Sequence, residues 1–388
     1  MAELVPRPFY HGANRRVLVT GGAGFIGSHL VDALLERGYA VRVYDNLEPQ
    51  VHGGLREEGK WPAYLSPEAE RILGDIRDRE ALRRALRDVD VVVHLAARVG
   101  VGQSMYEIEP YVDVNVRGTA VLLDLLANER HRVRRLVVAS SMSAYGEGQY
   151  ECPRCGVVYP AGRSEEQLRA RDWEVRCPHC GREVSPQPTP EEKPLSPASV
   201  YAVSKRDQEE MCLAVGRAYG LPTVALRLFN VYGPRQALSN PYTGVVAVFS
   251  SRLLNGNPPV VYEDGQQRRD FLHVSDAVQA FLLAMEETDA AYGALNVGSG
   301  RPITIREVAE TLIAHLGSPL QPEVSGQYRA GDVRHCFPTI ERLQAIGYRP
   351  HVTFAEGIGE TVEWVREQVA VDRFATAQQE LERRRLAV

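Results

Sequence analysis

The sequence predicts an α/β fold with a doubly wound parallel sheet and a second, smaller domain. Short apolar runs alternate with stretches of helical periodicity, a glycine-rich turn follows the first apolar run, and polar motifs follow later runs where a strand would end. At 388 residues the chain is long enough for two domains. Its residues are 44% hydrophobic and 24% charged, which is typical of a globular protein.

The first unit, "RRVLVTGGAGFIGSHLVDALLERGY", is predicted to form a buried strand, a glycine turn and an amphipathic helix. Gly21, Gly24 and Gly27 would let backbone N–H groups and the positive end of the helix approach a pyrophosphate. The next strand ends near Asp45, 18 residues beyond Gly27, where a carboxylate accepts hydrogen bonds from a ribose and repels a 2′-phosphate. This pattern predicts an NAD site on a Rossmann-type sheet. The alternatives are a glycine turn without function and an aspartate that only begins a turn.

Later strands are expected at 90–97, 133–141 and 223–233, separated by helices that include 110–128 and 201–218. Ligands of such sheets bind beyond the carboxyl ends of the strands. The motifs "GDIRD", "HLAA" and "VASSMSAYG" all lie at these ends. The C-terminal stretch "LERRRLAV" is expected to be a solvated helix end.

The stretch "SVYAVSKRDQEE" places Tyr201 and Lys205 four residues apart, on one face of a helix. A tyrosine has a pKa near 10, so about 4 kcal/mol of stabilisation of the tyrosinate is needed for it to act as a base near neutral pH. A neighbouring ammonium group favours that tyrosinate. The pair therefore predicts proton transfer; the alternative is a surface tyrosine beside a surface lysine.

Nine motifs in order resemble the extended short-chain dehydrogenases, and more narrowly the NAD-dependent epimerases and dehydratases of nucleotide sugars, the UDP-galactose 4-epimerase-like enzymes among them. The motifs are "TGGAGFIG", "DNL", "GDIRD", "HLAA", "SSMSAYG", "YAVSK", "LRLFNVYGP", "RRDFLHVSD" and "NVGSG". The resemblance extends from about residue 15 to 365.

The resemblance implies a catalytic triad of Ser141, Tyr201 and Lys205. The cofactor contacts that it implies are Gly21, Gly24, Phe25, Ile26, Gly27, Asp45, Asn46, Asp75, Ile76, Leu95, Ala96, Ala97, Asn115, Tyr201 and Lys205. The substrate contacts that it implies are Ser141, Asn230, Arg269 and Arg329. The guanidinium groups of the two arginines suit a diphosphate.

The residues after Ser141 bear on the reaction. Family dehydratases carry an acid beside the catalytic serine position, whereas this chain reads Met142-Ser143-Ala144-Tyr145 there, without a carboxylate. We therefore expect a nucleotide-sugar 4-epimerase that works through a transient 4-keto intermediate. UDP-hexoses and dTDP-6-deoxyhexoses such as dTDP-L-rhamnose remain open as substrates, and a dehydratase or decarboxylase of the same family is the alternative.

Four cysteines form the pattern Cys152-x2-Cys155-x21-Cys177-x2-Cys180 between Ser141 and Tyr201. This spacing predicts a structural zinc site, because four thiolates leave no open position on the metal. The zinc would stabilise an insertion, 149–185, which we expect near the mouth of the substrate cleft. A second hypothesis is an NAD-sensing regulatory protein that binds nucleic acid through this zinc ribbon. The seven acidic residues of 146–185 outnumber its six arginines, which argues against it.

These observations divide the chain into a tail at 1–14, an NAD-binding domain at 15–235 that contains the insertion, and a mainly substrate-binding part at 236–388 with segments that return to the sheet. We expect no nucleic-acid or membrane partner, since the net charge is −5 and no apolar run approaches the roughly 20 residues that cross a bilayer. The N-terminus lacks an apolar signal-peptide core, so a cytoplasmic location is expected. The resemblance implies a homodimer that associates through helices 110–128 and 201–218.

Overall fold

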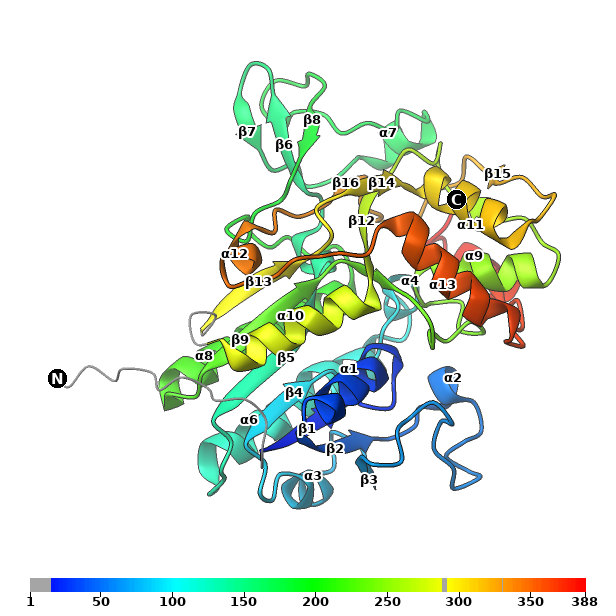
Figure 1. Ribbon diagram of the computed structural model, residues 1–388. Helices are drawn as coiled ribbons and strands as arrows, with labels where there is room; N and C mark the ends of the chain where they lie inside the picture. Colours follow the sequence, from blue (N-terminus) through cyan, green and yellow to red (C-terminus); the bar gives the residue numbers. More distant parts are fainter. Residues whose placement is uncertain (1–14, 288–291, 330) are drawn as a thin grey trace.

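The computed structural model describes residues 15–287, 292–329 and 331–388. The tail predicted at 1–14 lies outside them. A large sheet covered by helices on both faces forms the base of the molecule, a smaller mixed domain lies above the carboxyl ends of its strands, and a small three-stranded unit projects from that domain (Figure 1).

The large sheet has seven strands in the order β13-β9-β5-β4-β1-β2-β3, and every neighbouring pair is parallel. The strands are β1 (Arg16–Thr20), β2 (Ala40–Asp45), β3 (Glu70–Leu73), β4 (Val91–His94), β5 (Arg135–Ser141), β9 (Thr223–Leu228) and β13 (Gly293–Val297). Chain order reverses between β1 and β4, which creates the crevice in which such sheets bind ligands. The predicted doubly wound α/β fold is confirmed.

Helices cover both faces because alternate strand residues point to opposite sides. Val17 and Val19 of β1 pack with α1 (Phe25–Glu36) and α10 (Val274–Glu286). Leu18, between them, packs with the opposite core of α3 (Arg79–Ala85), α6 (Gly118–Asn128) and α8 (Val200–Tyr219). The middle residues of the central strands are apolar on both faces, as a two-sided parallel sheet requires.

Two predicted elements are divided in the structure. The expected strand 223–233 becomes β9 and then β10 (Asn230–Tyr232), which leaves the large sheet to pair with β12 (Arg268–His273). The expected helix 110–128 consists of α5 (Ile108–Tyr111), a π-helical turn (Val112–Arg117) and α6. Such turns bulge one residue out of helical register, and this one directs Asn115 into the protein.

The smaller domain joins short strands to helices around a separate core. Its strands are β10, β12, β14 (Pro302–Thr304), β16 (His335–Cys336), β11 (Val260–Val261) and β15 (Glu323–Val324). Its helices are α9 (Val245–Leu254), α11 (Ile305–Leu316), α13 (Phe354–Arg366) and α14 (Phe374–Arg383). The short helix α12 (Glu341–Ala345) packs on β13 instead, with Leu343 in the core of the large sheet. Both α10 and β13, which follow β12, belong to the large sheet layer, so the chain crosses between the layers more than once.

The insertion forms a unit of its own. β6 (Gln149–Cys152) pairs antiparallel with β7 (Gly156–Val158) and with β8 (Ser185–Gln187), and α7 (Glu165–Arg169) follows β7. Its small core consists of Tyr150, Cys152, Val158, Val175, Cys177 and Val184. Three short helices complete the chain: α2 (Pro49–His52), α4 (Val101–Ser104) and a 3₁₀ turn at Met142–Tyr145. Within the described ranges, no helix is long and apolar enough to cross a membrane.

Candidate active site

A cavity of about 670 Å³ lies between the carboxyl ends of the strands and the smaller domain. Almost all of the predicted site residues line it. From the predicted cofactor end these are Gly21, Gly24, Phe25, Ile26, Gly27, Asp45, Asn46, Asp75, Ile76, Leu95, Ala96 and Ala97, and from the predicted catalytic and substrate positions they are Ser141, Tyr201, Lys205, Asn230, Arg269 and Arg329. The fold thus brings together residues that are more than 300 positions apart in the chain.

The glycine turn leaves the amino end of α1 open. Gly24 caps the helix without a side-chain hydrogen bond, so the first N–H groups of α1 are not covered by a side chain. Gly21 has φ +72°, and a Cβ there would lie 2.8 Å from the backbone nitrogen of Ala96. A Cβ on Gly27 would lie 2.3 Å from the carbonyl oxygen of Gly21. Only glycine therefore fits at these two positions.

Asp45 ends β2 directly beneath this turn. Its carboxylate accepts hydrogen bonds from the N–H groups of Ala23 (3.0 Å) and Leu47 (2.9 Å), and His52 lies 4.0 Å away. Burial raises the pKa of Asp45. Each carboxylate oxygen still has a lone pair free after these bonds, which a ribose hydroxyl can use.

A second acidic residue follows β3. Asp75 accepts hydrogen bonds from the guanidinium group of Arg77 (2.7 and 2.8 Å) and from the Asn46 amide (3.3 Å). The Arg77 hydrogen bonds hold the pKa of Asp75 down, to about 2. Asp75 is therefore a carboxylate at neutral pH.

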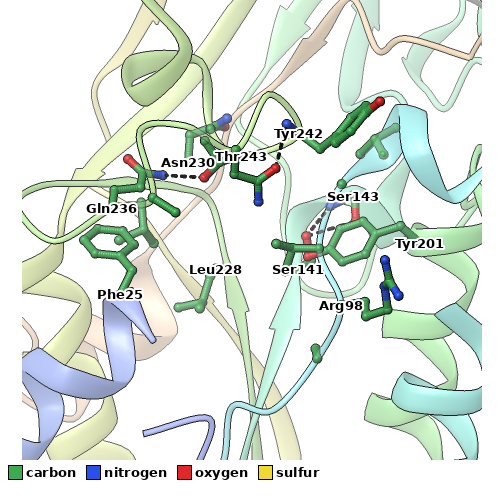
Figure 2. Close-up of a pocket in the computed structure, with 18 of the residues that line it drawn as sticks. Phe25, Arg98, Ser141, Ser143, Tyr201, Leu228, Asn230, Gln236, Tyr242 and Thr243 are labelled. Carbon is green, nitrogen blue, oxygen red and sulfur yellow. Dashed lines mark hydrogen bonds between the residues drawn. The ribbon is translucent and has the colours of Figure 1, made fainter. Parts of the chain in front are cut away.

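Ser141 and Tyr201 lie next to each other on the cavity wall (Figure 2). Ser141 is the last residue of β5, and its oxygen accepts hydrogen bonds from the N–H (3.2 Å) and the hydroxyl (2.9 Å) of Ser143. Tyr201 stands in the first turn of α8, whose start is fixed because the backbone N–H of Tyr201 donates to the Ser104 hydroxyl (2.9 Å). Burial raises the pKa of Tyr201, while a hydrogen bond with Ser141 acts in the opposite direction.

Lys205 follows Tyr201 by one helical turn and is buried. Its ammonium group donates to the side-chain oxygen of Gln208 (2.8 Å), and the Gln208 amide donates to the Thr119 hydroxyl (2.8 Å). Burial lowers the pKa of Lys205 to about 8, so the group still carries its charge at neutral pH. Burial and the charge of Lys205 lower the pKa of neighbouring His94 to about 3, which keeps that imidazole neutral.

Asn115, predicted as a cofactor contact, does not line the cavity. It is completely buried behind the wall, where its amide accepts from the N–H of Arg98 (2.7 Å) and donates to the carbonyl oxygen of Arg98 (3.1 Å) and to the Ser204 hydroxyl (2.9 Å). The π-helical turn turns its side chain inward. Asn115 therefore joins the segment after β4 to α8 and supports the site from behind.

The predicted substrate contacts lie at the other end of the cavity. The side-chain oxygen of Asn230 is buried and has no hydrogen-bond partner. The Arg269 guanidinium donates to the carbonyl oxygens of Val333 and of Arg334 (2.8 Å). Arg329 pairs with Asp332 (2.9 Å) and lies 4.8 Å above the Tyr262 ring.

Several residues that line the cavity were not predicted. Arg98 and Tyr242 lie on either side of Tyr201, Thr243 lies beside Asn230, and Gln236 lies across the cavity near Phe25 (Figure 2). Arg98 directly follows "HLAA" at the carboxyl end of β4, so its position alone could have revealed it. The side of α14 formed by Phe374, Ala377, Gln378 and Leu381 also lines the cavity. Of the stretch "LERRRLAV", which we expected to be a solvated helix end, residues 382–385 are exposed, whereas Leu381 and Ala387 are buried.

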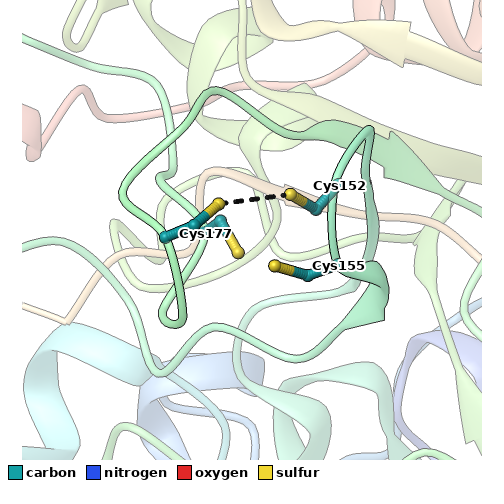
Figure 3. Close-up of side chains that lie close together, drawn as sticks. Cys152, Cys155 and Cys177 are labelled. Atoms are coloured by element: carbon teal, nitrogen blue, oxygen red, sulfur yellow. Dashed lines mark hydrogen bonds between the residues drawn. The ribbon is translucent and has the colours of Figure 1, made fainter.

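The four cysteines converge in the insertion (Figure 3). Their sulfur atoms all lie within 4.8 Å of one another, and the sulfurs of Cys152 and Cys180 are 3.6 Å apart. Zn–S bonds of 2.3 Å in a tetrahedron place sulfurs about 3.8 Å apart. Gly156 and Gly181 follow the second cysteine of each pair with nearly equal positive φ of +72° and +70°. The two pairs thus form equivalent turns whose geometry fits a four-thiolate site.

The insertion lies beside the cavity, where the Arg163 guanidinium donates to the carbonyl oxygen of cavity-lining Asp332 (3.1 Å), but it does not form the cavity wall. None of the residues 149–185, all of which the structure describes, lines the cavity. The unit packs on the smaller domain through a buried ion pair of Arg163 with Glu263 (2.8 Å) and through an ion pair of half-exposed Glu174 with buried Arg334 (2.6 Å). Arg334 is completely buried and also pairs with Glu263 (2.8 Å) and Asp264 (2.7 Å).

Comparison with known proteins is consistent with this geometry. Residues 17–161 and 180–298, more than half of the chain, match the model of the NAD dependent epimerase/dehydratase family. The chain belongs to this family. The gap in the match, 162–179, falls inside the insertion, as expected for an addition to the family fold.

Individual relatives of the family are similar over nearly the whole chain. The dTDP-L-rhamnose 4-epimerase of Burkholderia thailandensis is 36% identical over 92% of this chain and 96% of its own. The crystal structure of a Thermotoga maritima UDP-glucose 4-epimerase with UDP-glucose is 32% identical, with a TM-score of 0.72, and covers 91% of this chain and 99% of its own. The UDP-glucose 4-epimerase of Thermus thermophilus in complex with NAD is 33% identical, with a TM-score of 0.70, and covers 91% and 100%.

Enzymes with other chemistry also occur among these relatives. A dTDP-glucose 4,6-dehydratase of an Actinoplanes species is 32% identical over 90% of this chain and 98% of its own. The relatives named above at 36% and 33% identity are epimerases, and the prediction of an epimerase enzyme is confirmed.

Proposed function

We propose that this protein is an NAD-dependent nucleotide-sugar 4-epimerase, which inverts the sugar carbon C4 through a 4-keto intermediate. The observation that carries the proposal is the surroundings of Ser141 and Tyr201. Among the described residues that line the cavity, carboxylates come from Asp45, Glu48, Asp75 and Asp332. Three follow β2 or β3 at the cofactor end, and the fourth pairs with Arg329. No acid next to the reacting pair can expel a hydroxyl group, which favours reversible oxidation at C4.

The glycine turn and the acids at the cofactor end support NAD. The turn keeps side chains away from the open amino end of α1, where a pyrophosphate fits, and Asp45 offers lone pairs to ribose hydroxyls. NAD when bound accepts hydride from C4 and returns it. The remaining chemistry is a proton transfer and belongs to the chain.

Tyr201 performs that proton transfer. As tyrosinate it takes the proton of the sugar 4-hydroxyl group, and it returns the proton when C4 is reduced. Ser141 hydrogen-bonds the same oxygen and relays the proton, while the Lys205 ammonium stabilises the tyrosinate. Arg269, Arg329 and Asn230 hold the diphosphate, about which the keto sugar turns to present its other face.

The proposal is tested with a panel of nucleotide sugars that includes UDP-glucose, UDP-galactose and dTDP-L-rhamnose, whose C4 configuration is followed by NMR. We expect at least one of them to reach an equilibrium mixture of C4 epimers. A keto or decarboxylated end product would instead assign the chain to the dehydratase or decarboxylase chemistry of its family.

We further propose that the insertion binds one structural zinc ion through Cys152, Cys155, Cys177 and Cys180. The sulfur spacing and the two equivalent glycine turns support this site. Metal analysis of the purified protein should find one zinc per chain and none in a Cys155→Ser, Cys177→Ser variant. Equal zinc content in both proteins would refute the site.

We also propose a homodimer formed through α5, the π-helical turn, α6 and α8. Apolar side chains are exposed along these elements: Ile108 by 53%, Val112 by 44% and Val203 by 43%. Burying such residues is a common driving force of association. Val112→Glu together with Val203→Glu should produce a monomer in analytical ultracentrifugation. A native protein that is itself monomeric would exclude the dimer.

A further inference from the structure

The C-terminal helix α14 forms part of the cavity wall. Phe374, Ala377, Gln378 and Leu381 recur at helical spacing, so one face of α14 borders the cavity along its whole length. Ala377 and Leu381 are buried although α14 is the last helix of the chain. By contrast, Ala375 on the other side of the helix is exposed.

Contacts on both sides of the cavity hold this helix in place. Toward the smaller domain, the Tyr262 hydroxyl donates to the side-chain oxygen of Gln378, and the Arg252 guanidinium lies 4.5 Å from the Phe374 ring centre. Toward the large sheet, Leu381 packs on Gly102, where a Cβ would lie 3.3 Å from a Leu381 methyl group.

The chain beyond α14 is anchored as well. Val388 and Tyr328 exchange two backbone hydrogen bonds of 2.9 and 3.0 Å. On the other side, the Arg384 guanidinium lies 4.5 Å from the ring centre of Tyr106. The C-terminal segment 370–388 therefore spans the cavity from one layer of the molecule to the other.

The position of α14 relates it to one part of a nucleotide sugar. Tyr201 and Ser141 mark the place of the reacting sugar, and Arg329 marks that of the diphosphate. Tyr262 connects Arg329 to α14, because its ring lies under the guanidinium and its hydroxyl bonds Gln378. The helix is therefore adjacent to the end of the cavity where Arg329 would hold the diphosphate.

The chemistry of this end of the cavity differs from that of the sugar end. Phe374, Ala377 and Leu381 are apolar, and Val260 and Phe249 line the same cavity. Apolar and aromatic surfaces suit a planar base far better than a sugar or a phosphate.

We propose that α14 forms one wall of the subsite for the nucleoside base, so that the C-terminal segment is part of the substrate-binding site. The proposal rests on the proposed function, since it places the nucleoside of that substrate. It assigns to α14 the recognition of the pyrimidine nucleoside diphosphate and leaves the binding of NAD to other elements.

Two matched tryptophan variants test this proposal. Ala377→Trp adds a large ring on the cavity side of α14, and Ala375→Trp adds the same ring on the exposed side. Binding of UDP and of dTDP to each protein is measured by isothermal titration calorimetry, together with the NAD content and the steady-state KM and kcat. We expect Ala377→Trp to weaken the binding of the preferred nucleotide at least tenfold and to raise KM with NAD content unchanged, whereas Ala375→Trp binds like the parent protein.

The outcomes separate the proposal from the function on which it rests. Unchanged nucleotide affinity in Ala377→Trp, or equal losses in both variants, would overturn the role of α14 and leave the epimerase assignment intact. Failure of the parent protein to bind either UDP or dTDP would overturn both. If Ala377→Trp does not fold, Leu381→Ala is judged by the same criteria, with an expected loss of about threefold.

Discussion

In the proposed mechanism, Tyr201 loses a proton at a position where burial opposes its ionisation. Burial raises its pKa, and the hydrogen bond with Ser141 offsets only part of that effect. In that mechanism the Lys205 ammonium one turn away favours the tyrosinate, as would the positive charge of a bound oxidised nicotinamide. At the residue scale, catalysis therefore depends on holding positive charge close to one buried hydroxyl group.

Replacing that hydroxyl group tests this dependence. Tyr201→Phe should lower kcat about 10³-fold, the usual size of a general acid–base contribution, and should leave the NAD content unchanged. Tyr219→Phe, an exposed tyrosine on the same helix, is the control and should be fully active. Substantial epimerase turnover of Tyr201→Phe would remove Tyr201 from the mechanism.

The lowered pKa of Lys205 predicts how the free energy of unfolding depends on pH. Its pKa is about 8 in the folded protein and 10.5 in an unfolded chain, so folding must bury a charged lysine at any pH below about 8. That cost, on the order of 3 kcal/mol, disappears as the pH rises from about 8 to 10.5, because the folded protein then holds the neutral amine. Lys205→Met should be inactive in the epimerase assay. In the absence of NAD it should nevertheless be more stable to unfolding than the parent protein at pH 7.

Urea unfolding between pH 7 and 10 measures this difference. The advantage of Lys205→Met should shrink steadily above pH 8, because both proteins share every other titrating group. A constant advantage across the range would show that Lys205 does not titrate as its burial implies.

At the scale of elements, the insertion is joined to the smaller domain by buried charges. Glu263 lies between Arg163 of the insertion and Arg334 beside β16, at 2.8 Å from each. All three side chains are no more than 2% exposed. Arg334 and its neighbour Val333 also supply the carbonyl oxygens that hold Arg269. By binding Arg334, the insertion braces the substrate end of the cavity without lining it.

Neutralising Glu263 should therefore be costly. Glu263→Gln leaves two buried guanidinium groups with less opposing charge, a change that destabilises proteins by about 3 kcal/mol. Glu165→Gln removes an exposed ion pair within α7 and should cost less than 1 kcal/mol. Equal urea midpoints for the two variants would mean that the buried pairs contribute no more than surface pairs.

Sequence reasoning succeeded where a local pattern has a direct structural consequence. The glycine turn, the spacing of Tyr201 and Lys205 and the cysteine pairs each depend on short segments, and the structure brings their members together. Sequence reasoning failed where the position of a side chain depends on distant parts of the chain. The inward turn of Asn115 requires a π-helical turn that no propensity signals, and the contacts of the insertion pair residues up to 169 positions apart.

At the scale of the whole molecule, one cavity combines three contributions. The large sheet supplies the cofactor end and the reacting pair, the smaller domain supplies the arginines, and the C-terminal helix closes the far wall. Only the reacting pair decides which reaction follows C4 oxidation, and it lacks a neighbouring acid. We therefore expect that the hydrogen that leaves C4 returns to C4.

Isotope tracing tests that claim most directly. A substrate nucleotide sugar deuterated at C4 is incubated with the enzyme in ordinary water, and both epimers are examined by NMR. The account predicts that deuterium remains at C4 in both epimers without exchange with solvent. Deuterium found at C6, or lost to water, would contradict it.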